Sequence, residues 1–124
     1  MKTNTKIILG VIAVLVIGGP MLIWVNYMRT PGTLDQFTQC IADSGTKFYG
    51  AFWCPHCQKQ KQLFGKSAKL LPYIECSTPN GKGVLQVCLD AEIKGYPTWE
   101  FPDKSRQTGE VELKTLAEKT SCVL

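Results

Sequence analysis

The sequence predicts a small α/β domain, with a central sheet flanked by helices, preceded by one apolar helix at the N-terminus. Two observations predict this class. Strand-like and helix-like segments alternate along residues 33–122, and the last two strand-like segments form a hairpin pattern. Ahead of them, residues 7–25 contain no charged side chain. We therefore expect a membrane anchor with its flanks over residues 1–29 and one domain over residues 30–124.

The apolar run is IILGVIAVLVIGGPMLIWV, and its 19 residues are enough for a helix to cross the roughly 30 Å core of a bilayer. Trp24 and Tyr27, at its far end, suit the membrane interface. A cleaved signal peptide is an alternative, but its apolar core is normally shorter and ends in small residues. No A-x-A site follows this run. We expect a single uncleaved transmembrane helix.

The charges around this run indicate an orientation. Lys2 and Lys6 precede it and Arg29 follows it, so the positive-inside bias places the N-terminus in the cytoplasm and the domain on the extracytoplasmic side. In residues 30–124, 11 basic residues balance 10 acidic ones, which provides no electrostatic footprint for nucleic acid. We expect a solvated helix face at the lysines in positions 59, 61, 66 and 69.

The first half of the domain is expected to contain two helices around one strand. A T-x-x-Q capping box begins at Thr33, and Gly45 can end the helix that follows it. Residues 47–53, KFYGAFW, form an aromatic-rich run suited to a buried strand. A second helix is expected over residues 55–71, because a proline suits its first turn and another proline stops it.

The second half is expected to contain a strand, a loop rich in Gly, Pro and Asn, a helix, a hairpin and a final amphipathic helix. In order, these elements are expected over residues 72–76, 77–83, 84–94, 98–101 with 106–111, and 113–120. The whole order is α-β-α-β-α-β-β-α, which favours a small sheet with helices on both faces.

All six cysteines follow the anchor, and on the extracytoplasmic side they favour disulfides over metal. Zinc would need a second close pair beside Cys54 and Cys57, but Cys76 and Cys88 are too far apart in sequence. A c-type haem would need a histidine where Gln58 stands. We therefore expect neither a metal nor another cofactor. A purely structural Cys54–Cys57 bridge would close a very small ring and constrain little of the unfolded chain.

A redox pair accounts best for the stretch W-C-P-H-C at residues 53–57. Cys54 lies where the strand meets the helix, and the free N–H groups and dipole of a helix N-terminus stabilise a thiolate. Cys57, one turn later, can attack a mixed disulfide at Cys54 and release the product. His56, when protonated, would add positive charge near Cys54. The alternative for His56 is an exposed helix residue without a role.

The four outer cysteines are expected to form two structural disulfides. Cys76 and Cys88 bracket the Gly- and Pro-rich loop, and pairing them would join a strand end to the next helix. Cys40 and Cys122 are then paired by elimination, and their bridge would join the two ends of a small domain. Four cysteines allow three connectivities, so the pairing is a prediction that peptide mapping can test.

Two motifs in order, W-C-P-H-C and G-Y-P-T at residues 95–98, resemble the thioredoxin superfamily. The resemblance covers nearly all of residues 33–122 and implies a thioredoxin-like fold, a mixed sheet flanked by helices. It implies that Pro97 is a cis-proline packed against the cysteine pair. The expected catalytic residues are Cys54, Cys57, His56 and Pro97, and the expected substrate-contacting residues are Trp53, Pro55 and Tyr96. Thioredoxins carry a buried acid six residues before the first active cysteine, and Phe48 stands there.

The segments KFYGAFWCPHCQ, YIECSTPNGKG and GYPTWEF are similar to the thioredoxin-like domain fused to bacterial and plant homologues of vitamin K epoxide reductase. In those fusions the domain passes disulfides between substrate proteins and the membrane enzyme. Here a single helix stands in place of the multi-helix catalytic domain. The resemblance implies protein thiols and disulfides as substrates. A quinone-linked membrane oxidoreductase, similar to vitamin K epoxide reductase, is the implied partner.

The function that we expect is a membrane-anchored thiol-disulfide oxidoreductase that promotes disulfide formation or exchange in exported proteins. A thiol reductase fed by a membrane electron carrier is one alternative. A non-catalytic module that holds unfolded peptides around Trp53, Tyr96 and the cis-proline is another, and a structural metal domain is a third.

Overall fold

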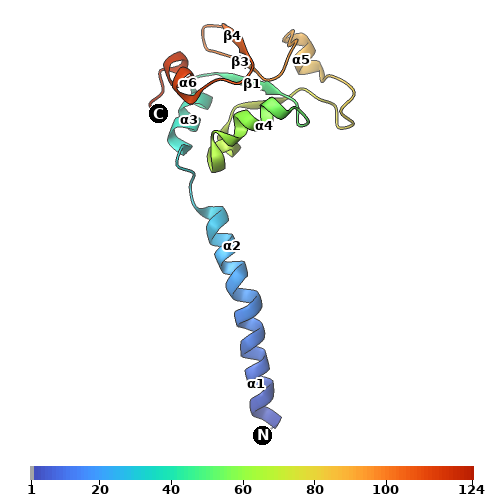
Figure 1. Cartoon of the computed structure of the whole chain (residues 1–124), viewed down its shortest axis with the longest axis vertical. Helices are drawn as coiled ribbons and strands as arrows, with labels where there is room; N and C mark the ends of the chain where they lie inside the picture. The colour runs from blue at the N-terminus through green and yellow to red at the C-terminus, as the bar shows by residue number, and fades with distance from the viewer. Residues whose placement is uncertain (1) are drawn as a thin grey trace. The chain divides into compact units, whose positions relative to one another are not determined.

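A computed structural model describes residues 2–124. The chain divides into two compact units, Met1–Pro31 and Gly32–Leu124. The second unit has the predicted α/β class. Its elements confirm the thioredoxin-like fold, with a four-stranded mixed sheet and accompanying helices (Figure 1).

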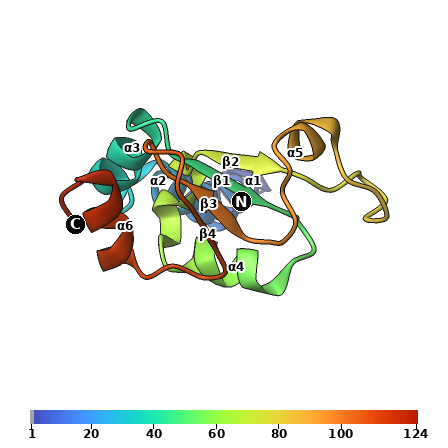
Figure 2. The same ribbon diagram turned by 90° about the horizontal axis from the view of Figure 1, so that it is seen from above.

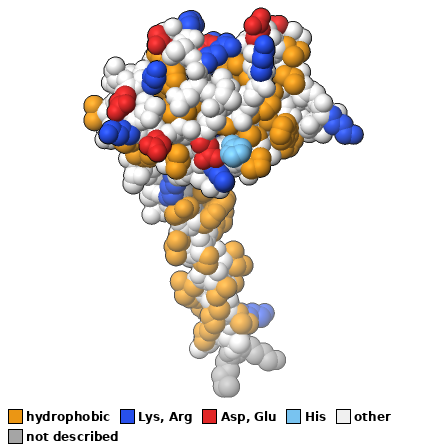
Figure 3. Space-filling view, turned by 45° about the horizontal axis from the view of Figure 1, so that its top comes forward, with side chains coloured by type: hydrophobic (Ala, Val, Ile, Leu, Met, Phe, Trp, Pro, Cys, Tyr) orange, Lys and Arg blue, Asp and Glu red, His pale blue; other side chains and the backbone are white. Residues whose placement is uncertain are grey.

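The N-terminal unit is a helix covered by hydrophobic side chains (Figure 3). It consists of α1 (Lys2–Ala13), a π-helical segment η1 (Val14–Gly18) and α2 (Gly19–Arg29). Pro20 has no N–H to donate to the preceding turn, which explains why the regular pattern breaks just before it. Residues Asn4–Arg29 are long and apolar enough to cross a membrane by length and composition, a criterion that a signal sequence also meets.

The sheet of the second unit has the strand order β2-β1-β3-β4. β1 is parallel to β2 and antiparallel to β3, which pairs antiparallel with β4. The parallel pair is joined through helix α4, whereas a short turn joins the hairpin, as the sequence pattern predicts. The strands are β1 (Lys47–Gly50), β2 (Tyr73–Glu75), β3 (Thr98–Glu100) and β4 (Arg106–Thr108).

The helices of this unit are α3, α4, the 3-10 helix η2, α5 and α6. Helices α3 and α6 lie side by side at one end of the sheet, and α5 lies at the other end (Figures 1 and 2). A core of aromatic and aliphatic side chains, including Phe48, Trp99 and Leu116, is almost completely buried between the layers. The bounds are α3 (Asp35–Asp43), α4 (Pro55–Gln62), η2 (Gly65–Leu70), α5 (Gln86–Asp90) and α6 (Leu113–Thr120).

The predicted capping box at Thr33 is wrong. Helix α3 begins at Asp35, and its N-cap, Leu34, makes no side-chain cap hydrogen bond. Instead, the Leu34 N–H donates to the Ser67 hydroxyl at 3.1 Å. A side chain from a distant segment therefore satisfies a backbone donor near the start of the helix. At the other end Gly45 adopts a left-handed φ of 84°, which confirms the predicted helix end.

Several predicted elements are shorter in the structure, among them the strand expected over residues 106–111, which ends at Thr108. The strand expected over residues 47–53 ends at Gly50, because residues 51–54 form a turn closed by the Cys54 N–H and the Ala51 carbonyl. The helix expected over residues 55–71 is interrupted after Gln62, and Gly65 there has a positive φ of 53°. The helix expected over 84–94 is reduced to the five residues of α5.

Candidate active site

The two cysteines of the motif lie where β1 gives way to α4. Cys54 is the N-cap of α4 in an extended conformation, and Pro55 follows at the first helical position. The Cys57 N–H donates to the Cys54 sulfur at 3.4 Å. Both cysteines are free and buried, with exposed fractions of 5% and 1%. A sulfur in this position can accept backbone hydrogen bonds as a thiolate, which is the state that attacks disulfides.

Burial sets Cys57 apart chemically. Desolvation, with a further contribution from its hydrogen bond to Cys54, raises the pKa of the Cys57 thiol from 9.0 to about 12. A hydrogen bond with the Ala51 backbone and the charge of Lys61 act in the opposite direction. Cys57 is therefore a protonated thiol at neutral pH, and it must lose its proton before it can attack.

The loop before β3 lies against the cysteine pair. The Tyr96–Pro97 peptide bond is cis, the geometry that the family resemblance implies. The Cys54 thiol donates to the Tyr96 carbonyl at 3.8 Å. Burial, together with the charges of Glu75 and Cys57, raises the pKa of the Tyr96 hydroxyl. The structure thus places Pro97 and Tyr96 beside Cys54, from a segment about 40 residues further along the chain.

Trp53 and Pro55 flank Cys54 on the exposed side of the site. Trp53 is 49% exposed, and its ring meets the Tyr96 ring edge-on with centroids 6.1 Å apart. Its indole N–H donates to the Ser77 hydroxyl at 2.9 Å. Phe52, which is 50% exposed, adds a second aromatic surface next to it. These side chains form an exposed apolar rim beside Cys54.

His56 is exposed and has a partner that the sequence did not indicate. Its Nδ1 lies 2.6 Å from Glu110 Oε1, from the segment before α6. Figure 3 shows the single histidine of the chain beside an acidic side chain. Any positive charge on His56 is partly balanced by this carboxylate, so its net field at Cys54 is weaker than that of an unpaired imidazolium.

Glu75, on β2, is a site residue that sequence reasoning missed. Its Oε1 accepts the backbone N–H of Phe52 at 3.2 Å and that of Ser77 at 2.9 Å, and its Oε2 accepts the Tyr73 hydroxyl at 2.8 Å. The Glu75 carboxylate therefore stabilises the turn at residues 51–54, which contains Trp53 and Cys54. Glu75 lies in the segment YIECSTPNGKG that carried the family resemblance, but sequence reasoning assigned it no role; its place on the strand parallel to β1 brings it next to Gly50.

Gln60, on the inner face of α4, was also missed. It is fully buried and makes two hydrogen bonds to one residue: its amide donates to the Val111 carbonyl at 2.9 Å and its carbonyl accepts the Val111 N–H at 2.7 Å. This pairing fastens the segment that carries Glu110 to the helix that carries His56. The signal that could have identified Gln60 is its place on the buried face of the helix, because a buried polar side chain needs a hydrogen-bond partner.

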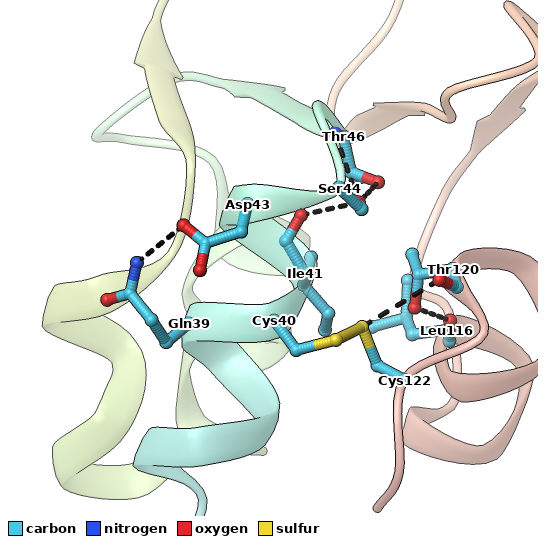
Figure 4. The surroundings of a disulfide bond; sticks show 9 residues. All are labelled: Gln39, Cys40, Ile41, Asp43, Ser44, Thr46, Leu116, Thr120 and Cys122. Carbon is cyan, nitrogen blue, oxygen red and sulfur yellow. Dashed lines mark hydrogen bonds between the residues drawn. A yellow bond between two sulfur atoms is a disulfide. The ribbon is translucent and has the colours of Figure 1, made fainter.

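The outer four cysteines form two disulfides, Cys40–Cys122 and Cys76–Cys88, the pairs expected from the sequence. The first joins α3 to the segment after α6, as Figure 4 shows. The second joins the end of β2 to α5 and is completely buried. With these four sulfurs bridged, Cys54 and Cys57 are the two that are free to exchange.

The side chains around the cysteine pair do not form a cluster suited to a metal. Among residues 2–124, no three or more His, Cys, Asp or Glu side chains are grouped so as to hold a metal ion. Glu75 and His56 are engaged in the hydrogen bonds described above.

Two curated relatives are similar to part of the chain, whereas no family model matches it. Thiol-disulfide oxidoreductase LTO1 of Arabidopsis thaliana is 50% identical over 80 residues, which cover 61% of this chain and 21% of that protein. Thioredoxin domain-containing protein 5 homolog of Drosophila melanogaster is 36% identical over 75 residues, which cover 52% of this chain and 17% of that protein. The chain thus spans about a fifth of the length of these relatives.

The similarities and the structure agree with one another. The mixed four-stranded sheet, the free cysteine pair at the start of a helix and the cis-proline beside it are the features that the family resemblance implied. Together with the two relatives, they identify the fold as thioredoxin-like and support a place for this chain in the thioredoxin superfamily.

Proposed function

We propose that the protein is a membrane-anchored thiol-disulfide oxidoreductase that works through Cys54 and Cys57. The observation that carries this proposal is the free cysteine pair at the N-terminus of α4, beside Pro97, in a domain whose other four cysteines are bridged. The relative named thiol-disulfide oxidoreductase supports the same activity.

In the oxidising direction, a substrate thiolate attacks Cys54 of the Cys54–Cys57 disulfide. A bond forms between the substrate sulfur and Cys54, the Cys54–Cys57 bond breaks, and Cys57 leaves as a thiolate that takes a proton. A second substrate thiolate then attacks the substrate sulfur of the mixed disulfide and releases Cys54. The substrate loses two electrons and gains a disulfide, and the protein keeps two thiols.

We further propose that electrons flow from substrate thiols into this protein. Stabilisation of the Cys54 thiolate by the helix N-terminus favours the reduced form, which makes the disulfide a stronger oxidant. The Pro-His pair between the cysteines resembles strongly oxidising periplasmic family members. His56 adds to this effect when protonated, within the limit that its pairing with Glu110 imposes.

The anchor suggests where the reduced protein is reoxidised. We propose that residues 1–29 hold the catalytic domain of residues 30–124 at the extracytoplasmic surface, with the N-terminus in the cytoplasm. Five residues, 30–34, connect α2 to α3, so the domain stays close to the membrane. A quinone-linked oxidoreductase similar to vitamin K epoxide reductase is the partner that this arrangement suits.

Oxidation of a reduced dithiol peptide by the purified full chain tests the activity. Cys54→Ser is expected to abolish turnover. Cys57→Ser, mixed instead with a peptide that carries a disulfide, is expected to trap a mixed disulfide, because the Cys54 thiolate attacks the peptide disulfide and no Cys57 thiol is present to release it. The matched control is Cys40→Ala/Cys122→Ala, which removes two cysteines outside the site and should keep turnover. Unchanged turnover in Cys54→Ser would contradict the proposal.

The redox potential of the Cys54–Cys57 pair against glutathione tests the direction. We expect a value well above that of thioredoxin, about −270 mV, and a less oxidising value for His56→Ala. A potential near that of thioredoxin would favour a reductase fed by a membrane carrier. Peptide holding that survives alkylation of Cys54, without turnover, would favour the binding module.

A further inference from the structure

Lys61 differs from the solvated lysine that the sequence pattern predicts. Its ammonium nitrogen lies 3.3 Å from the centroid of the Tyr73 ring, a cation–π contact between α4 and β2. Lys61 also follows Cys57 by four residues, which places the two side chains on the same face of α4. Lys59, two residues before it on the same helix, is exposed.

Tyr73 is held close to the sulfur of Cys57. A side-chain carbon built on Gly50 would lie 2.8 Å from the edge of the Tyr73 ring and 2.9 Å from Cys57 Sγ. The ring and the sulfur therefore converge on the one position of β1 that has no side chain. The Tyr73 hydroxyl donates to Glu75 at 2.8 Å, which fixes the ring from its other end.

Burial and nearby charges set the protonation of Tyr73 and Cys57. Burial, followed by the hydrogen bond to Glu75 and the charges of Glu75, Cys57 and Cys54, raises the pKa of Tyr73, so the ring carries a neutral hydroxyl. Cys57 is influenced by Cys54, which opposes a charge on its sulfur, and by Lys61, which favours one. Lys61 is thus a cation placed to act on a Cys57 thiolate.

We propose that Lys61, held against the Tyr73 ring, stabilises the negative charge that develops on Cys57 Sγ during thiol-disulfide exchange. This inference rests on the proposed function. When a thiolate attacks Cys54, the electron pair of the breaking Cys54–Cys57 bond passes to Cys57 Sγ, which then takes a proton from water. In reverse, Cys57 gives its proton to water and attacks. Tyr73 is a positioning residue for Lys61 in both directions.

This role affects rates and leaves the equilibrium unchanged. At neutral pH both end states lack a charge on Cys57, because it is either bridged or protonated, whereas the transition state carries one. Removing the Lys61 charge should therefore slow reduction and oxidation of the pair by the same factor. The redox potential, which depends on the end states alone, should stay the same.

Stopped-flow fluorescence of the full chain in detergent tests this. Reduction of the Cys54–Cys57 disulfide by glutathione, and reoxidation by glutathione disulfide, are followed at pH 7 in Lys61→Met, Lys61→Arg and the matched control Lys59→Met. We expect Lys61→Met to slow both reactions about three- to tenfold, as a single charge near a partly buried sulfur implies. Lys61→Arg should stay within about twofold, Lys59→Met should match the wild type, and about 1 M KCl should shrink the defect.

Three results would overturn the inference: equal rates in Lys61→Met and Lys59→Met, a changed potential with one rate unaffected, or a defect that salt does not alter. Tyr73→Phe keeps the ring and should keep the rates, whereas Tyr73→Leu should behave as Lys61→Met does. If Tyr73→Leu does not fold, the comparison of Lys61→Met with Lys61→Arg decides. A wild-type chain that does not exchange with glutathione at all would count against the proposed function instead.

Discussion

At the residue scale, Cys54 and Cys57 differ because of the position each takes in the first turn of α4. Cys54 caps the helix, where its sulfur meets a backbone N–H, whereas Cys57 lies inside the turn against β1. The same residue type thus gives one candidate nucleophile and one buried thiol that is costly to ionise.

The raised pKa of Cys57 predicts a pH dependence of stability. The folded state keeps this thiol protonated up to about pH 12, whereas in the unfolded chain it ionises near its ordinary value of 9.0. Burial of the neutral thiol therefore contributes stability below that value, and the contribution is lost as the pH rises toward the folded pKa. Urea unfolding of the reduced protein should show a steeper loss of stability above pH 9 in the wild type than in Cys57→Ser. Parallel pH curves would contradict this assignment.

Glu75 provides a second prediction at this scale. Glu75→Ala leaves the N–H groups of Phe52 and Ser77 without their acceptor, so we expect a loss of about 2 kcal/mol and faster hydrogen exchange at the Phe52 amide. Glu75→Gln keeps an acceptor of the same shape and should lose less than half as much. If both variants are equally destabilised, the charge of Glu75 matters more than its hydrogen bonds to the turn.

At the scale of elements, the site depends on how α4 is fastened to its neighbours. The helix is short and polar, and its buried face is held through Gln60 to the segment before α6 and through Lys61 to β2. Two side chains of one helix therefore connect the cysteine pair to segments that lie far away in sequence.

Gln60→Leu tests the first of these connections. The substitution leaves the buried N–H and C=O of Val111 unpaired, so we expect a loss of about 2–3 kcal/mol in the free energy of unfolding. Gln62→Leu, at the exposed end of the same helix, is the matched control and should change stability by less than about 0.5 kcal/mol. Denaturant unfolding of both variants measures the difference, and equal losses would show that Gln60 is not the fastening residue.

At the scale of the whole molecule, the two disulfides stabilise the domain over different lengths of chain. The Cys40–Cys122 bridge spans 82 residues and joins the first helix of the domain to its last segment, whereas Cys76–Cys88 spans 12 residues and stays local. Closing the longer loop removes more entropy from the unfolded chain.

Removing each bridge separately tests this division. Cys40→Ala/Cys122→Ala should lower the free energy of unfolding by about 4 kcal/mol, and Cys76→Ala/Cys88→Ala by about 3 kcal/mol. Because the longer bridge lies away from the cysteine pair, its loss should leave the rate of Cys54 alkylation in the folded protein unchanged. A larger loss from the local bridge would show that native packing around it, rather than loop length, sets its contribution.

Local residue patterns determined the class of the domain, the order of its elements and the division of the cysteines. Helical periodicity, aromatic runs and glycine or proline breaks act over a few residues, so they can be read along the chain. The lengths of the elements were harder to predict from the sequence. β1 ends at Gly50 and the helix that begins at Pro55 is interrupted near Gly65, because turn hydrogen bonds and a positive φ override the periodic pattern there.

Tertiary structure alone decided which charged and polar groups contact the residues around Cys54 and Cys57. Glu110 reaches His56 across 54 residues of sequence, and Glu75 reaches the Phe52 N–H across 23. The active strand itself contains no acid, and the lysine pattern of α4 predicts a solvated Lys61. The register of the sheet pairs Gly50 with Glu75, so the neighbouring strand β2 supplies an acid at the end of β1. Tyr73, on the same strand β2, contacts Lys61 through its ring. No short-range pattern encodes such contacts, because they arise when segments far apart in sequence pack together.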